Sequence, residues 1–214
     1  MSPTNHRAVL FDLDGVLIDS PKAHTDAWIE VFRRYGVTIP PRRIYLEEGK
    51  ESRGIAAGLN VEYDLKLTEW VLDELIAEKR RLYRQNAPQG MRPDAHSAVT
   101  AALSLGWRTG LVSGSVRTNI QAVLSPRDLD LFETVVAAGD YSHGKPHPEP
   151  FLTACRKLGV QPSDCIAVEN APLGIKAAKA AGLKVVALTT TLSPEDLREA
   201  DVILDDLFGF EDIL

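Results

Sequence analysis

A series of short apolar runs constrains the fold of this chain more than any other feature of its sequence. The runs span residues 8–13, 107–113, 134–137, 166–168 and 185–188, with a weaker run at 202–204. They show no alternation of apolar and polar residues, which is typical of strands buried on both faces of a parallel sheet. We therefore expect a central sheet of parallel strands.

Helical segments lie between most of these runs. The segments 95–105, 148–158 and 173–181 are each followed by a glycine, and a proline stands at the start of each or within two residues before it. Early proline and a glycine just past the end are typical of helix boundaries. The alternation of strands and helices predicts an α/β fold with a doubly wound, Rossmann-like parallel sheet.

This alternation breaks between residues 20 and 89, where the pattern is helical and no strand is convincing. Ser20 is expected to cap a helix that has Pro21 at its first position. Two apolar stripes at helical spacing follow, made of Ala27, Trp28, Val31, Phe32 and Tyr35, and of Val71, Leu72, Leu75, Ile76, Lys79, Leu82 and Tyr83. We predict a core of residues 1–19 and 90–214 and an inserted α-helical cap of residues 20–89.

Composition narrows the class of protein. Apolar residues make up 44% of the chain, enough for a full core, and the net charge of −6 argues against binding to nucleic acid. No apolar run approaches the length of a membrane span or of a signal peptide. Cys155 and Cys165 show no metal-binding or disulfide pattern, so we expect buried thiols and a cytoplasmic location. We also expect a monomer.

Two carboxylates, Asp12 and Asp14, end the first apolar run just before Gly15. In open α/β sheets, ligands bind outside the carboxyl ends of the strands. A pair of acids placed there can divide the work between a nucleophile or metal ligand and a proton donor. Taken alone, the pattern fits an ordinary strand-to-turn transition equally well, since Asp-Gly is a common turn dipeptide.

Three other segments favour the catalytic interpretation, and each also follows a predicted strand. They carry Ser113-Gly114-Ser115, Lys145 within Gly-Lys-Pro-His-Pro, and Glu169-Asn170. Hydroxyls and free backbone N–H groups hold phosphate, and lysine neutralises its charge. Chance is unlikely to supply an acid pair, a hydroxyl, a lysine and an acid with an amide in that order.

With these four motifs in order and a helical insertion after the first strand, the chain resembles the haloacid dehalogenase superfamily of phosphotransferases over its whole length. The resemblance is to the branch with β-phosphoglucomutase and the sugar-phosphate and phosphoglycolate phosphatases. It implies Asp12 as nucleophile, Asp14 as general acid/base, Ser113 as phosphoryl ligand and Lys145 as the neutralising cation. It also implies Mg²⁺, held by Asp12, the backbone carbonyl of Asp14 and the fourth motif, Glu169-Asn170. Mg²⁺ and Lys145 are expected to lower the pKa of Asp12.

Within the superfamily, an acid at position 14 fits phosphatases and mutases. P-type ATPases carry threonine there, and dehalogenases lack the second acid. The fourth motif departs from the branch, which usually has Glu-Asp where this chain has Glu169-Asn170. An asparagine oxygen binds Mg²⁺ without bringing charge, so we expect weaker metal binding unless Glu169 compensates.

Further candidates for substrate binding come from the same resemblance. They are His24, Gly49, Lys50, Arg53, Gly114, Ser115 and Arg117. For His24 a polar position on an amphipathic helix is an equally simple interpretation, and for Gly49, Lys50 and Arg53 a solvated loop is. His143 and His147 flank Lys145, but one histidine beside a proline-rich turn does not make a zinc site.

The sequence thus predicts a Mg²⁺-dependent phosphatase acting on a small phosphate monoester, with no nucleic-acid or membrane partner. The alternative within enzymes is a sugar-phosphate mutase. β-Phosphoglucomutase has a Lys-Asn pair after its second motif-two serine, whereas Val116-Arg117 follows Ser115 here, which favours hydrolysis. In a different class, Asn170 alone favours a catalytically silent binding protein.

Overall fold

The computed structural model describes residues 7–214 and contains a parallel sheet in the order β3-β2-β1-β4-β5-β6. The strands are β1 (Ala8–Phe11), β2 (Arg108–Val116), β3 (Thr134–Ala138), β4 (Cys165–Glu169), β5 (Lys184–Leu188) and β6 (Val202–Leu204). The order reverses direction at β1, which lies between β2 and β4. Such a reversal places the ends of neighbouring strands around one crevice.

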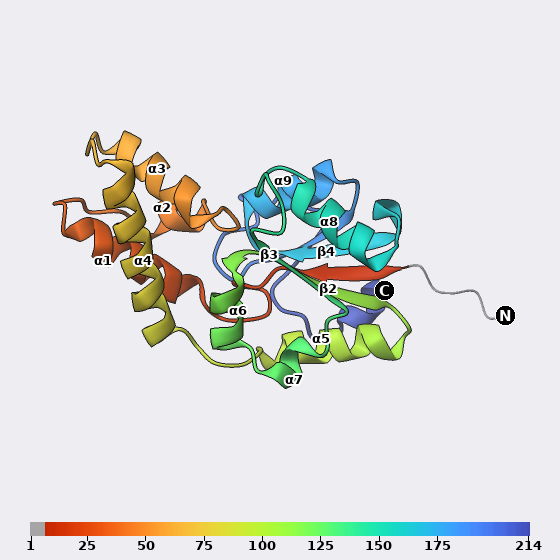
Figure 1. The fold of residues 1–214 in the computed structure, drawn as a ribbon. Helices are drawn as coiled ribbons and strands as arrows, with labels where there is room; N and C mark the ends of the chain where they lie inside the picture. Colours follow the sequence, from red (N-terminus) through yellow and green to blue (C-terminus); the bar gives the residue numbers. More distant parts are fainter. Residues whose placement is uncertain (1–6) are drawn as a thin grey trace.

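Helices cover both faces of this sheet (Figure 1). One face carries α5 (Pro93–Ser104), α6 (Arg117–Val123) and α7 (Pro126–Leu129), and the other carries α8 (Glu149–Leu158) and α9 (Pro172–Ala180). Two 3₁₀ turns, Pro162–Asp164 and Phe210–Ile213, complete the core. In β1, Val9 and Phe11 pack into the hydrophobic cluster on one face, and Ala8 and Leu10 into the cluster on the other. Burial on both faces explains why the strand shows no alternation.

A helical unit projects from the carboxyl ends of the strands (Figure 1). It consists of α1 (Pro21–Arg33), α2 (Pro41–Tyr45), α3 (Ser52–Glu62) and α4 (Glu69–Asn86). Its centre is a separate cluster in which Trp28 and Phe32 of α1 pack with Leu72, Leu75 and Ile76 of α4. The predicted insertion of a helical cap is therefore confirmed, and we call this unit the cap.

Several local expectations were wrong. Ser20 precedes α1 but makes no capping hydrogen bond with its side chain. Tyr35 lies beyond the end of α1 and is exposed, so it does not extend the apolar stripe. Strand β2 continues past Ser113 to Val116, with an irregular register against β3. The cap boundaries at 20 and 89 stay a prediction, and residues 1–6 of the predicted core lie outside the described residues. Within residues 7–214, the helices are all too short or too polar to cross a membrane.

Candidate active site

The centre of the site is a buried lysine between two carboxylates. Asp12 directly follows β1, and its backbone N–H donates to Val168 O in β4 at 2.9 Å. Lys145 Nζ donates to Asp12 Oδ1 at 2.5 Å and to Glu169 Oε1 at 2.6 Å. A third bond, to Val112 O at 3.1 Å, uses the last ammonium proton. The lysine therefore joins three adjacent strands, at the ends of β1 and β4 and in the middle of β2.

Lys145 does not neutralise all of the negative charge around it. Burial raises the pKa of Asp12 to about 8, against the attraction of Lys145 and with the further repulsion of Glu169 and Asp14. Burial alone would lower the pKa of Lys145, but Asp12 and Glu169 raise it. Lys145 alone is therefore not enough to lower the pKa of Asp12 below its usual value, as we had expected of Lys145 and Mg²⁺ together. The site carries excess negative charge that a cation would offset.

Asp14 is the centre of a second network that belongs partly to the cap. Its Oδ1 accepts from Ser20 Oγ at 2.5 Å and from His24 Nε2 at 3.0 Å, and its Oδ2 accepts from Ser115 Oγ at 3.2 Å. Burial on its own would raise the pKa of Asp14. The attraction and hydrogen bonds of His24, the bond from Ser20 and the charge of Lys79 outweigh burial and hold that pKa well below its usual range.

Lys79, on α4, is a site residue that the sequence did not identify as functional. Its Nζ lies 2.5 Å from Nδ1 of His24, and the His24 ring stacks on Tyr83 with centroids 3.8 Å apart. Burial lowers the pKa of Lys79 to about 7. Burial and the charge of Lys79 also lower the pKa of His24. The only sequence signal was a lysine within an apolar stripe, which marks a buried position but not its neighbours.

The second motif, Ser113-Gly114-Ser115, packs closely against the cap loop that contains Gly49. Ser115 N donates to Ser113 Oγ at 3.0 Å, within the part of β2 whose register against β3 is irregular. A Cβ on Gly114 would lie 2.6 Å from the backbone oxygen of Gly49. No real side chain tolerates that distance, so glycine at 114 is what allows the cap loop to reach the sheet.

Glu48, in the same cap loop, contacts the fourth motif directly. Asn170 Nδ2 donates to Glu48 Oε2 at 2.7 Å and lies 3.3 Å from Thr191 Oγ1. The other oxygen, Glu48 Oε1, is buried and has no hydrogen-bond partner among the described residues. Desolvation raises the pKa of Glu48 well above its usual range. A cation bound beside this carboxyl group would lower its pKa and keep it ionised. The carboxyl groups of Asp12, Asp14, Glu48 and Glu169 thus lie close enough to repel one another, and Lys145 contacts only two of them. This set of oxygen donors fits a divalent cation of the Mg²⁺ type.

Most of the predicted site residues line a small cavity between the cap and the sheet. From the predicted set, its lining includes Asp12, Asp14, His24, Gly49, Lys50, Gly114 and Ser115. Lys79, Glu48, Trp28 and Ser52 line it as well and were not predicted as site residues. Ser113, Lys145, Glu169 and Asn170 are buried and do not line this cavity.

Two predicted arginines have other partners. Arg53 forms ion pairs with Glu69 and Asp73 of α4, and Arg117 pairs with Asp140 at 2.8 Å. Neither lines the cavity, and both are about half exposed. In this arrangement they bind the protein's own acids rather than facing Asp12.

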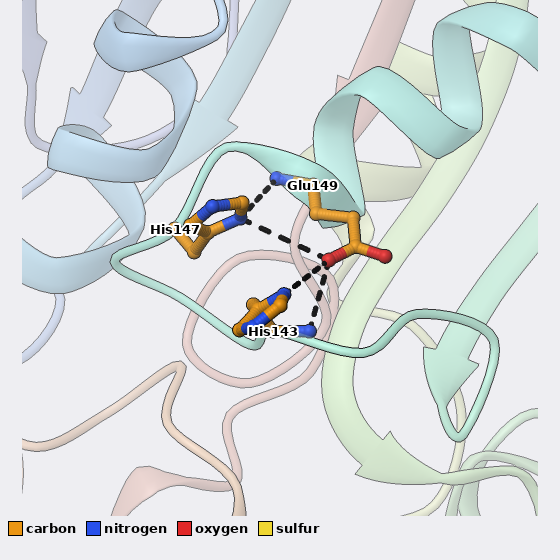
Figure 2. Close-up of side chains that lie close together, drawn as sticks. All are labelled: His143, His147 and Glu149. Atoms are coloured by element: carbon orange, nitrogen blue, oxygen red, sulfur yellow. Dashed lines mark hydrogen bonds and ion pairs between the residues drawn. The ribbon is translucent and has the colours of Figure 1, made fainter.

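The loop that carries Lys145 is held by a small cluster that Figure 2 shows. Glu149 accepts hydrogen bonds from the backbone N–H groups of Ser142 and His143, at 2.9 and 3.0 Å. Nδ1 of His143 lies 2.9 Å from the same carboxylate, and Nδ1 of His147 accepts from Glu149 N at 3.2 Å. The sequence had not brought these side chains together. Their contacts close the loop and so fix the backbone on both sides of Lys145.

Comparisons with known proteins agree with this geometry. A profile for haloacid dehalogenase-like hydrolases matches residues 6–182. The chain is 36% identical over 212 residues to validoxylamine A 7'-phosphate phosphatase from Streptomyces hygroscopicus subsp. limoneus, covering 94% of each chain. It is 30% identical to hexitol phosphatase B from Escherichia coli K12, covering 96% of this chain and 95% of the relative. The structure is similar to that of β-phosphoglucomutase from Clostridium difficile, with a TM-score of 0.85, 27% identity and coverage of 97% and 95%.

Proposed function

The chain belongs to the haloacid dehalogenase-like hydrolases, and we propose that it is a Mg²⁺-dependent phosphatase that forms an aspartyl-phosphate on Asp12. One observation carries the proposal. Asp12 and Asp14 line the same cavity, yet Asp12 is bound to Lys145 and Asp14 to the His24 network. Two neighbouring carboxylates in such different surroundings are suited to different roles.

We assign the metal site to Asp12, the backbone carbonyl of Asp14 and Asn170 of the fourth motif. The uncompensated charge around Asp12 and the unpartnered oxygen of Glu48 support a cation there. When bound, Mg²⁺ offsets the repulsion between the Asp12 carboxylate and an incoming phosphoryl group. Lys145 contributes a second positive charge through its bond to Asp12 Oδ1.

The reaction proceeds in two displacements. An oxygen of Asp12 attacks phosphorus, the bond from phosphorus to the leaving oxygen breaks, and that oxygen takes a proton from Asp14. Asp14 then removes a proton from the water that cleaves the aspartyl-phosphate, which releases inorganic phosphate and restores Asp12. Ser113 and the N–H groups beside it bind the phosphoryl oxygens during both steps.

The hydrogen bonds around Asp14 supply its proton. Asp14 is ionised in this arrangement and must be protonated before it can act as an acid. Lys79 reaches His24 Nδ1, and His24 Nε2 reaches Asp14, so a proton can pass from the lysine through the imidazole to the carboxylate. The pKa of about 7 suits Lys79 to give up and regain that proton near neutral pH.

We propose a phosphorylated polyol or sugar as the substrate, with His24, Gly49, Lys50 and Ser115 around it. The names of the relatives, a hexitol phosphatase and a validoxylamine A 7'-phosphate phosphatase, support this class. We also propose a monomer in the cytoplasm. The thiols of Cys155 and Cys165 share a hydrogen bond at 3.8 Å and form no disulfide, which fits a reducing compartment.

A mutase is the second candidate, because the fold is similar to that of a β-phosphoglucomutase. The test is a panel of hexitol phosphates, sugar phosphates, phosphoglycolate and nucleotides, with and without Mg²⁺, following phosphate release. A parallel assay supplies β-glucose 1-phosphate with catalytic glucose 1,6-bisphosphate. Phosphate release that depends on Mg²⁺ is expected. Glucose 6-phosphate accumulating much faster than phosphate would establish the mutase instead.

A further inference from the structure

We propose that Glu48 of the cap is a positioning residue for the metal site, orienting Asn170 and supplying the negative charge that the asparagine lacks. The site is then complete only when the cap is seated on the sheet. This inference rests on the proposed Mg²⁺-dependent function. It assigns a role to a residue that lies outside all four motifs.

The direction of the contact fixes which atom of Asn170 is free to bind metal. A carboxylate can only accept hydrogen bonds, so the group of Asn170 that faces Glu48 Oε2 at 2.7 Å is the amide NH₂. The amide oxygen must then point the other way. Glu48 thus holds Asn170 with its ligand atom available, as carboxylates orient metal-binding histidines in other proteins.

The contact also changes the electronic character of the asparagine. A carboxylate that accepts from an amide NH₂ draws positive charge toward itself and leaves the amide oxygen more negative. Glu48 therefore restores part of the charge that an aspartate at 170 would carry. Its second oxygen, Oε1, is buried without a partner among the described residues and remains available to a cation or to its water ligands.

Position 170 and position 48 are matched to each other. With an aspartate at 170, two carboxyl groups would face each other at hydrogen-bond distance inside the protein. They would repel each other whenever a bound cation kept both ionised. Asparagine removes that repulsion. The departure from Glu-Asp in the fourth motif is thus a consequence of the acid in the cap rather than a loss of function.

Cap seating and the Glu48 contact depend on the same loop. Gly49, the next residue, packs against Gly114 and Lys145, where a Cβ on Gly49 would lie 3.1 Å from Lys145 Cδ. Glu48 itself is 9% exposed. When this loop leaves the sheet, Glu48 leaves Asn170 with it. Metal affinity and cap closure are therefore coupled.

The experiment is Mg²⁺ binding by calorimetry to the metal-stripped full chain, without substrate, for wild type, Glu48→Gln, Asn170→Asp and the double variant. Glu47→Gln, one residue away and removing the same charge, is the control. We expect Glu48→Gln to weaken Mg²⁺ binding about tenfold or more, within the range known for residues that orient metal ligands. Asn170→Asp alone should not strengthen binding, because its new charge faces Glu48.

The double variant decides whether the two positions act together. In it the roles are exchanged, with an acid at 170 and an amide at 48, and we expect Mg²⁺ affinity within about threefold of wild type, a non-additive result. Thermal unfolding of each variant without metal checks that the fold is intact. Equal Mg²⁺ affinity of Glu48→Gln and wild type, or additive effects, would overturn this inference.

Two further outcomes distinguish failure of the role of Glu48 from failure of the proposed Mg²⁺-dependent function. If Glu48 instead contacts a substrate hydroxyl, Glu48→Gln raises KM and leaves Mg²⁺ affinity at the wild-type value, which contradicts the inference. If wild type binds no Mg²⁺ and turns over in EDTA, the proposed function itself fails. If wild type and Glu48→Gln bind Mg²⁺ equally tightly, the role of Glu48 is disproved but the proposed function is not.

Discussion

Nζ of Lys79 and Nδ1 of His24 lie 2.5 Å apart and share a single hydrogen bond between two basic nitrogens. One nitrogen must accept, so the two side chains cannot both carry their full set of protons. With Nδ1 accepting, the His24 proton sits on Nε2 and points at Asp14, 3.0 Å away. The cap thus presents a neutral imidazole to Asp14, oriented by a lysine.

Replacing Lys79 by methionine should stabilise the protein in a pH-dependent way. The pKa of Lys79 is 10.5 in a free side chain and about 7 in the fold. Between these values the unfolded chain binds more protons, so wild-type stability rises with pH in that window. Lys79→Met does not have to bury a charged amine. Its free energy of unfolding at pH 7 should therefore exceed that of the wild type by a few kcal/mol, on the order set by the pKa difference, and by progressively less toward pH 10. Urea unfolding from pH 7 to 9.5 measures this, and a gap between the two proteins that stays constant with pH would contradict it.

Asp12→Asn should reduce phosphate release by about four orders of magnitude, because the amide is a poor nucleophile. The fold should survive, since Lys145 keeps its bonds to Glu169 and Val112. Beryllium fluoride should inhibit the wild type and not the variant, as expected for a mimic of the aspartyl-phosphate. Activity measured on a purified preparation checks both, and a fully active Asp12→Asn would disprove the nucleophile.

Glu169→Gln tests whether Glu169 binds the metal directly. Both of its oxygens are already engaged, Oε1 by Lys145 at 2.6 Å and Oε2 by Asn170 N at 3.2 Å. We therefore expect it to act through Lys145, so that Glu169→Gln lowers kcat and shifts Mg²⁺ affinity less than Glu48→Gln does. Mg²⁺ titrations of the two variants decide the matter. The larger shift in Glu169→Gln would make Glu169 the direct ligand.

Gly114→Ala should keep the cap from seating. Its Cβ would lie 2.6 Å from the Gly49 backbone oxygen, and backbone cannot move aside as a flexible side chain can. We expect lower kcat and higher KM, with the sheet intact by circular dichroism. Gly58→Ala is the control, since no described atom lies within 4 Å of its Cβ and it sits inside α3, where alanine should add about 0.5–1 kcal/mol of stability. Normal kinetics in Gly114→Ala would show that the close approach does not matter.

The sequence predicted the sheet and the core half of the site because both follow from local pattern. Asp12 and Glu169 each stand where a buried strand ends, and parallel strands end at one edge of the sheet. Lys145 was found through its motif, while the cluster that holds its loop depends on contacts of Glu149 that spacing does not reveal. Sequence reasoning also underestimated burial, which raises the pKa of Asp12 to about 8 despite Lys145.

The cap half of the site was predicted less well. Lys79 and Glu48 reach the cavity only through the packing of the cap on the sheet, and helical periodicity says which side of a helix is buried but not what it meets. Arg53 and Arg117 show the converse. Their positions in the sequence suited phosphate binding, but in the fold both side chains form ion pairs with acidic residues of neighbouring elements.

The bond between Glu48 and Asn170 has a consequence for how such proteins diversify and for how they can be re-engineered. Exchange of caps between relatives is an obvious route to new substrates. Here a cap graft would carry His24 and Glu48, which contact Asp14 and Asn170 of the recipient. It would also carry Lys79, which contacts His24 within the cap. A donor cap without an acid at position 48 would be compatible only with a recipient that has aspartate at 170, so the two positions are expected to change together during descent.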